Sequence, residues 1–209
     1  MKEVLRWIAL LAAAAALASA PAAAETILDL TPSDPPAPAA PTPAVPAPSA
    51  PAAGFRGEYL RNLAELEEKL VALAGATPAE LYRWRPGEGV RSIGEVYAHV
   101  VASNTLLPRS WGAPPLDGVD PAALQQSPPE KAQLVALLER SIEHVRKAFE
   151  DASPVDLERR VPAFGREATV RELFSTLVNH MHEHLGQSIA YARLKGVVPP
   201  WSAGAAAEH

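Results

Sequence analysis

Two histidines four residues apart, His180 and His184, are the most chemically informative feature of the sequence. Apolar residues recur at three- and four-residue steps through residues 173–189, which predicts an amphipathic helix. Residues four apart on a helix lie about 40° from one another on one face, so both imidazoles can reach the same point. His182 lies about 200° from His180 and should point away. Two converging imidazoles are the start of a histidine metal site.

A third inward-facing histidine would make such a site specific, and His99 is the best candidate. It lies at the edge of a second apolar stripe and can face the interior. His144 lies near a stripe's edge and is expected to be partly exposed, and His209 is terminal. Three neutral imidazoles from two helices, those of His99, His180 and His184, would leave coordination positions open for water or a substrate.

Three further residues are candidate pocket or outer-shell groups. Gln187 lies about 20° round from His180 on the same helical face, Glu183 lies towards a flank, and Asn104 follows His99 by one to two turns. The competing interpretation is that histidines at this spacing are surface or core residues, which is the commoner case. A buried trio without a ligand would be costly, because each ring nitrogen needs a partner and protonation would place like charges together.

Helical periodicity identifies the elements that must position these side chains. Four long apolar stripes run over residues 54–75, 92–107, 130–149 and 169–194. Residues 111–124 are rich in Pro and Gly, and this loop is long enough to fold over one end of a bundle. The prediction is an all-α four-helix bundle whose long connection between the second and third helices crosses over.

Start signals of the Ser/Thr-x-x-Glu type support these boundaries. They begin at Thr77, Ser92, Ser127 and Thr169. The signal at Thr77 precedes only a short predicted helical turn. Residues 151–166 are predicted to be irregular, and no segment shows a convincing strand pattern.

The first 53 residues are predicted to lie outside the folded domain. Residues 1–24 have a weakly basic start, about a dozen apolar residues and small-residue cleavage patterns, which are typical of a secretory signal peptide. Residues 25–53 are rich in Pro and Ala and are predicted to form a disordered, extended linker. The folded domain would span residues 54–202, followed by a flexible tail at 203–209. The signal-peptide pattern predicts that the protein is exported, to the periplasm or out of the cell. The alternative is that residues 1–24 are not cleaved and anchor the protein in a membrane.

Composition excludes several classes of function. The formal net charge is −5 and no cluster of Lys and Arg with interleaved aromatics occurs, which disfavours nucleic-acid binding. The chain contains no cysteine, so disulfides, thiolate metal sites and a cysteine nucleophile are excluded. The ligands of any metal site must therefore be His, Asp or Glu.

The motifs together resemble the DinB / YfiT-like superfamily. The resemblance is carried by residues 84–86 (Trp-Arg-Pro), residues 91–95 (Arg-Ser-Ile-Gly-Glu) before His99, and the Asn-His-x-x-x-His-x-Gly-Gln motif at residues 179–187. The ending at residues 191–202 is similar to endings in that family. The resemblance implies a four-helix bundle that binds a divalent metal through His99, His180 and His184. Many relatives carry adjacent histidines before the Gly-Gln, whereas the first of those positions here is Glu183.

The sequence predicts the ligands of such a metal more closely than the reaction that it would catalyse. Relatives include enzymes that transfer or isomerise substrates with a low-molecular-weight thiol, so the resemblance implies a metal-dependent thiol S-transferase. Export counts against a cytosolic thiol and permits hydrolysis by metal-activated water instead. The alternative is a non-catalytic protein that binds a metal or small ligand. Zinc, nickel, iron and manganese all accept three histidines. The expected binding partner is a small-molecule substrate or ligand. A homodimer is an open alternative to a monomer. Contact with a membrane is expected only if the N-terminal segment is not cleaved and remains as an anchor.

Overall fold

Four long helices dominate the computed structural model, which describes residues 54–202. They are α2 (Phe55–Ala76), α3 (Ile93–Leu106), α5 (Lys131–Asp151) and α7 (Val170–Leu194). None of the helices in this described range is long and apolar enough to cross a membrane. The signal peptide, linker and tail predicted at residues 1–24, 25–53 and 203–209 lie outside the described residues.

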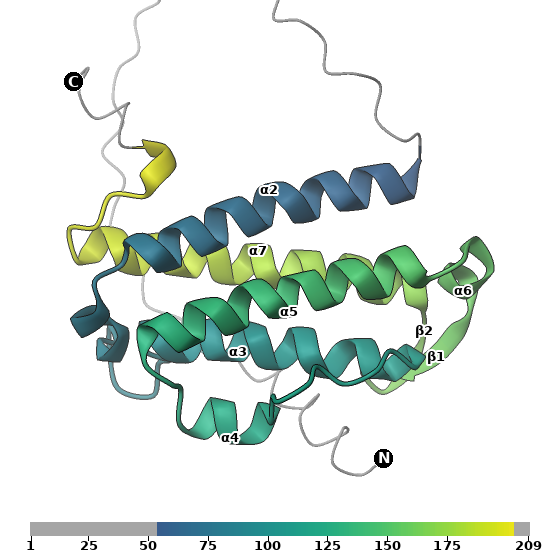
Figure 1. Ribbon diagram of the computed structural model, residues 1–209, viewed down its shortest axis with the longest axis horizontal. Helices are drawn as coiled ribbons and strands as arrows, with labels where there is room; N and C mark the ends of the chain where they lie inside the picture. The colour runs from purple at the N-terminus through teal and green to yellow at the C-terminus, as the bar shows by residue number, and fades with distance from the viewer. Residues whose placement is uncertain (1–53, 203–209) are drawn as a thin grey trace, which may run out of the picture. The chain divides into compact units, whose positions relative to one another are not determined.

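The four helices form a bundle in which each packs against two neighbours (Figure 1). The pairs are α2 with α7, α7 with α3, α3 with α5, and α5 with α2. At one end, Tyr59 near the start of α2 stacks on Phe149 near the end of α5, and Phe149 packs edge-on against Phe174 near the start of α7. Helices α2 and α7 therefore run in one direction and α5 in the other. The all-α four-helix bundle predicted from periodicity is confirmed.

The connection from α3 to α5 crosses the bundle, as predicted. A 3-10 helix, η3 (Leu107–Trp111), follows α3 directly, and Trp111 lies 4.5 Å from the ring of Phe174 at the aromatic end. The chain then returns along the bundle to a short helix, α4 (Pro121–Gln126), which packs on α3 before α5 begins (Figure 1). Because the chain returns before entering α5, helices α3 and α5 run parallel. This return places α4 against α3.

The core between these helices is continuous and apolar. Its largest fully buried side chains include Tyr97, Phe149 and Phe174 together with leucines of all the long helices except α3. Full burial of one such side chain contributes about 1.5–3 kcal/mol. Burial of apolar side chains on all four long helices therefore packs α3 and α7 against the same core.

Two of the predicted start signals are real caps and two are not. The Ser92 hydroxyl accepts from Glu95 N and the Glu95 carboxylate accepts from Ser92 N, which is a complete capping box. Thr169 caps α7 by accepting from the backbone of Glu172. The prediction at Ser127 is wrong, because Ser127 is the C-cap of α4 and donates its N–H to Ala123 O.

The prediction at Thr77 is wrong for a related reason. Its hydroxyl donates back to the carbonyl of Leu73 at 2.8 Å and so ends α2. The short helical turn that follows is a 3-10 helix, η2 (Ala79–Arg83), and it has no side-chain cap. In both failures the sequence motif was present but the residue ends the preceding helix, Thr77 through its hydroxyl and Ser127 through its backbone N–H.

The segment predicted as irregular contains regular structure. A short helix, α6 (Pro154–Glu158), leads into an antiparallel hairpin of β1 (Arg160–Ala163) and β2 (Arg166–Thr169). The turn consists of Phe164 and Gly165, which both have positive φ. Positive φ at both central residues defines the tight hairpin turn that matches strand twist, normally made by Asn-Gly or Asp-Gly. Phenylalanine in the first position conceals this turn in the sequence.

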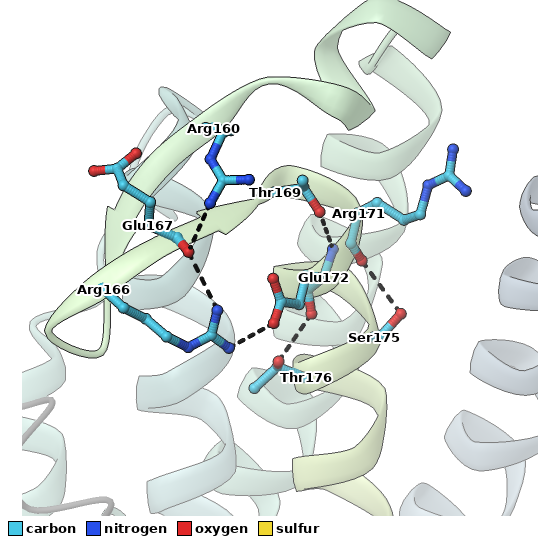
Figure 2. Close-up of polar contacts among 8 residues, drawn as sticks. All are labelled: Arg160, Arg166, Glu167, Thr169, Arg171, Glu172, Ser175 and Thr176. Atoms are coloured by element: carbon cyan, nitrogen blue, oxygen red, sulfur yellow. Dashed lines mark hydrogen bonds and ion pairs between the residues drawn. The ribbon is translucent and has the colours of Figure 1, made fainter.

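The hairpin is tied to the start of α7 by an arginine (Figure 2). Arg166 donates to a carboxylate oxygen of Glu172 at 2.5 Å and to the carbonyl of Glu167 at 3.2 Å, and Arg160 donates to that same carbonyl at 3.5 Å. Hydrogen bonding from Arg166 lowers the pKa of Glu172. These contacts fix where α7 begins. The chain after α7 ends in a 3-10 turn, η4 (Pro200–Ser202).

Candidate metal centre

Three histidines meet at the seam between α3 and α7. His99 comes from α3, and His180 and His184 come from α7. Each offers a nitrogen, and these nitrogens lie within 4.8 Å of one another. The Nε2 atom of His180 is 3.1 Å from Nε2 of His99 and 3.1 Å from Nε2 of His184. The structure thus brings together the three histidines that the sequence singled out.

Two glutamines hold the outer nitrogens of this trio. Nδ1 of His99 lies 3.1 Å from Oε1 of Gln125 on α4, and Nδ1 of His184 lies 2.9 Å from Oε1 of Gln187. An amide oxygen only accepts, so each Nδ1 must carry the proton and donate it. The amide nitrogen of Gln125 faces the carbonyl of Pro121, which agrees with this orientation. The Nε2 atoms of His99 and His184 consequently direct lone pairs at His180.

Burial keeps the three imidazoles neutral. His99 and His184 are each 7% exposed. Burial is the main cause that lowers the pKa of His99 to about 4 and that of His180 to about 3, and the charge of Arg91 lowers both further. Burial also lowers the pKa of His184, opposed by its hydrogen bond to Gln187 and the charge of Glu183. Neutral imidazole is the form that binds metal ions.

The converging nitrogens fit a divalent transition metal. Without a cation, a proton on Nε2 of His180 can satisfy His99 or His184 but not both. A cation can accept all three lone pairs. Two nitrogens that each lie about 2.0–2.1 Å from a tetrahedral zinc ion are separated by about 3.4 Å, close to the spacing here. Three imidazoles also form a donor set that zinc, nickel and iron accept.

The other residues predicted for this site occupy different environments. Gln187 lies in the outer shell of His184, and its amide nitrogen donates to the hydroxyl of Tyr191 at 2.9 Å. Glu183 is exposed on the flank of α7. Asn104 is fully buried elsewhere in the core, where its amide donates to Ser141 Oγ at 3.2 Å. The same amide also donates to Met181 Sδ at 3.4 Å, so Asn104 joins α3 to both α5 and α7, and it is not among the groups hydrogen-bonded to the histidines.

Two residues that act on the trio, Gln125 and Arg91, escaped the sequence reasoning. Gln125 lies in a six-residue helix inside a Pro-rich loop, where no periodicity marks it. The only available signal was the length of that loop, which predicted coverage of one end of the bundle. Arg91 belongs to the motif at residues 91–95 that carries the family resemblance. Its charge acts on all three histidines.

The loop before α3 is braced against the helix beside the site. The backbone N–H of Ile93 donates to the carbonyl of Trp84 at 3.1 Å, and Arg85 pairs with Glu95 at 2.9 Å. Gly94 allows this approach, since a Cβ there would lie 3.1 Å from the carbonyl oxygen of Tyr82. Trp84 and Arg85 therefore brace this loop against the start of α3.

Comparison with known proteins identifies the superfamily to which the fold belongs. The model of the DinB superfamily matches residues 62–188. No curated protein matches the chain significantly. Among solved structures, a DinB-like protein from Bacillus cereus is 18% identical, with 68% of this chain and 93% of that chain covered and a TM-score of 0.58.

Two proteins from Bacillus subtilis have the same fold. One is a DinB-like protein that is 21% identical, with 68% of this chain and 93% of that chain covered and a TM-score of 0.52. The other is YfiT, described as a probable metal-dependent hydrolase with an unusual four-helix bundle topology. YfiT is 15% identical, with 72% of this chain and 95% of that chain covered and a TM-score of 0.56. At these identities the similarity concerns the fold alone.

Proposed function

Because this chain belongs to the DinB superfamily, we propose that it binds a divalent metal through His99, His180 and His184 and acts as a metal-dependent hydrolase. The observation that carries the proposal is the convergence of the three Nε2 atoms. The Nδ1 atoms of His99 and His184 are already hydrogen-bonded to glutamine oxygens, and Nδ1 of His180 is buried. The description of YfiT as a probable metal-dependent hydrolase supports the same reaction class. A small molecule with a hydrolysable bond is the expected substrate.

The residues of this chain have defined tasks in such a reaction. Gln125 and Gln187 hold the imidazoles of His99 and His184 in the tautomer that presents Nε2. When bound, a divalent metal supplies a Lewis acid that favours deprotonation of water or a thiol and polarises a carbonyl. None of the side chains hydrogen-bonded to the trio in the described range is a carboxylate, so the full positive charge of the ion acts on the reactants.

Thiol S-transfer is the second candidate, and the same electrostatics favour it. Three neutral ligands leave the ion with its complete charge, which suits a thiolate as well as hydroxide. Export, which we propose from the signal-type sequence of residues 1–24, argues for hydrolysis, since cytosolic thiols are scarce outside the cell. A non-catalytic protein that holds a metal or small ligand in the bundle is the third possibility.

Turnover assays with controlled metal content separate these three functions. Purified protein is stripped with a chelator, reconstituted with zinc, nickel, iron or manganese, and assayed on an ester panel and on a thiol with chlorodinitrobenzene. Ester turnover that appears only after reconstitution and is absent in His99→Ala supports the hydrolase. Turnover only with the thiol supports the transferase. Metal binding without turnover in either assay would support the non-catalytic binding protein.

A further inference from the structure

The glutamine bonded to His184 is itself held by a second side chain. Oε1 of Gln187 lies 2.9 Å from Nδ1 of His184, and Nε2 of Gln187 donates to the hydroxyl oxygen of Tyr191 at 2.9 Å. The three residues follow one another along α7 at steps of three and four, so they share one face of the helix. They form a hydrogen-bonded row that leads from the trio towards the end of α7.

The other two histidines of the trio lack this support. Nδ1 of His99 lies 3.1 Å from Oε1 of Gln125, whose amide nitrogen donates to the carbonyl of Pro121 at 3.5 Å, which is long for a hydrogen bond. Nδ1 of His180 is buried and has no hydrogen-bond partner within residues 54–202. In that range, only the imidazole of His184 therefore has an outer partner that a second side chain holds at short distance.

Packing fixes the ring of Tyr191 and with it the position of the hydroxyl. Tyr191 is 8% exposed, and its ring lies edge-on to the indole of Trp84 with the ring centroids 5.7 Å apart. Trp84 is held in turn, because its carbonyl accepts from the N–H of Ile93 at 3.1 Å and Lys195 Nζ lies 5.3 Å from the centre of its ring. A ring held in this way presents a fixed oxygen to the amide of Gln187, which restricts rotation of that side chain.

We propose that Tyr191 is a positioning residue for the metal centre: its hydroxyl holds the amide of Gln187 against Nδ1 of His184, so that this imidazole keeps Nε2 directed at the ion. The inference rests on the metal-binding function proposed above. While Nδ1 donates to the amide oxygen, the amide nitrogen needs an acceptor of its own, and the phenol oxygen provides it. Without the hydroxyl, the amide must leave its hydrogens unpaired or turn towards another acceptor and release His184.

The zinc affinity of the full-length protein, measured by competition with a chromogenic chelator, tests this inference. Tyr191→Phe keeps the ring against Trp84 and removes only the hydroxyl. It should weaken zinc binding about two- to tenfold, which is the effect expected for one neutral hydrogen bond. Tyr82→Phe is the matched control, because it removes a buried hydroxyl that is bonded to the carbonyl of Ala74 at 2.7 Å. Its zinc affinity should equal that of wild type.

A second background separates positioning from a purely structural role of the hydroxyl. If Tyr191 acts through Gln187, Tyr191→Phe should change zinc affinity by less than about twofold when Gln187 is already alanine. A hydroxyl that only stabilises the end of α7 would cause the same loss whether or not Gln187 is present. The four zinc affinities of this double-mutant cycle therefore isolate the contribution that passes through the amide.

The outcomes distinguish failure of this inference from failure of the proposed function. Wild-type zinc affinity in Tyr191→Phe, or an equal loss in both backgrounds, would overturn the role of Tyr191 and leave the metal site intact. Wild-type protein that does not bind zinc would overturn the metal function and this inference with it. If Tyr191→Phe does not fold, NMR of the zinc-loaded wild type decides. The side-chain amide hydrogens of Gln187 should exchange with solvent more slowly than those of the exposed Gln126, and equally fast exchange would contradict a held amide.

Discussion

The bundle has two opposite seams that both contain histidine, and their charges differ. At the α3–α7 seam, three buried imidazoles face one another and their hydrogen-bond partners are amides. At the α2–α5 seam, His144 lines an open groove of about 810 Å³ with four glutamates, Arg140 and Lys147. The first seam concentrates neutral nitrogen ligands away from water, whereas the second mixes charges of both signs in contact with water.

This difference shows why a histidine alone does not indicate function. Arg146 pairs with Glu67 across the second seam and with Glu143 on its own helix, so two of the four glutamates there already have a cation. Ion pairs whose side chains keep contact with water, as these do, contribute about 0–1 kcal/mol and are screened by salt. At the first seam the Nε2 atoms of the three imidazoles face one another, and a bound cation would accept their lone pairs. The two seams therefore predict different responses to the same substitutions.

The largest difference is expected for metal binding. His184→Ala removes one of three ligands and should abolish stoichiometric binding of zinc, because two imidazoles without a preformed third ligand hold the ion weakly. His144→Ala, the matched change at the other seam, should leave binding at wild-type level. Competition with a chromogenic chelator measures both. Equal zinc affinity in the two variants would show that the trio is not the site.

A smaller effect is expected from the outer shell. Gln187→Ala leaves all three ligands but releases Nδ1 of His184. Loss of such a partner typically weakens metal binding about 10- to 100-fold. Gln125→Ala should do the same through His99. Isothermal titration at fixed pH measures the affinities, and a change of less than twofold in both variants would show that the amides do not orient the ligands.

Much of the first seam could be predicted from the sequence because it depends on helical geometry. The four-residue spacing of His180 and His184 fixes their common face, and the apolar stripe around His99 turns it inward. The bundle and its crossover also followed from periodicity and from the length of one connection.

The parts that escaped prediction depend on tertiary contacts. Gln125 reaches His99 because the crossover folds α4 onto α3, which no local pattern records. The amide of Asn104 donates to Ser141 Oγ on α5 and to Met181 Sδ on α7, contacts between helices that no local pattern records. The hairpin was missed because Phe164 adopts a positive φ, which is unusual for a bulky residue. Tertiary packing overrides local preference at each of these positions.

Acid should destabilise the metal-free protein through the first seam. Burial lowers the pKa of His99 to about 4 in the folded state, whereas an unfolded histidine titrates near 6.5. Between these values the unfolded chain binds more protons, so the free energy of unfolding falls as pH decreases through that range. From pH 7 to pH 5 the loss attributable to His99 is at most about 2 kcal/mol.

Denaturant unfolding in excess chelator at the two pH values measures this loss. His99→Gln should show a smaller decrease in stability between pH 7 and pH 5 than wild type, because glutamine does not titrate. Lys147→Gln, a change of an exposed cation at the second seam, should keep the wild-type decrease. An identical decrease in His99→Gln and wild type would contradict neutral burial of that imidazole.

The smallest effect is expected at the second seam itself. Arg146 pairs with Glu67 on α2 and with Glu143 on its own helix, and all three side chains retain contact with water. Arg146→Met keeps the aliphatic packing and removes the charge, so it should lower the free energy of unfolding by about 1 kcal/mol or less. In 1 M salt, where the Debye length is about 3 Å, the difference from wild type should shrink. Its zinc affinity should equal that of wild type, since the ion pair lies across the bundle from the histidines; a weakened zinc affinity would mean that the two seams are energetically coupled through the core.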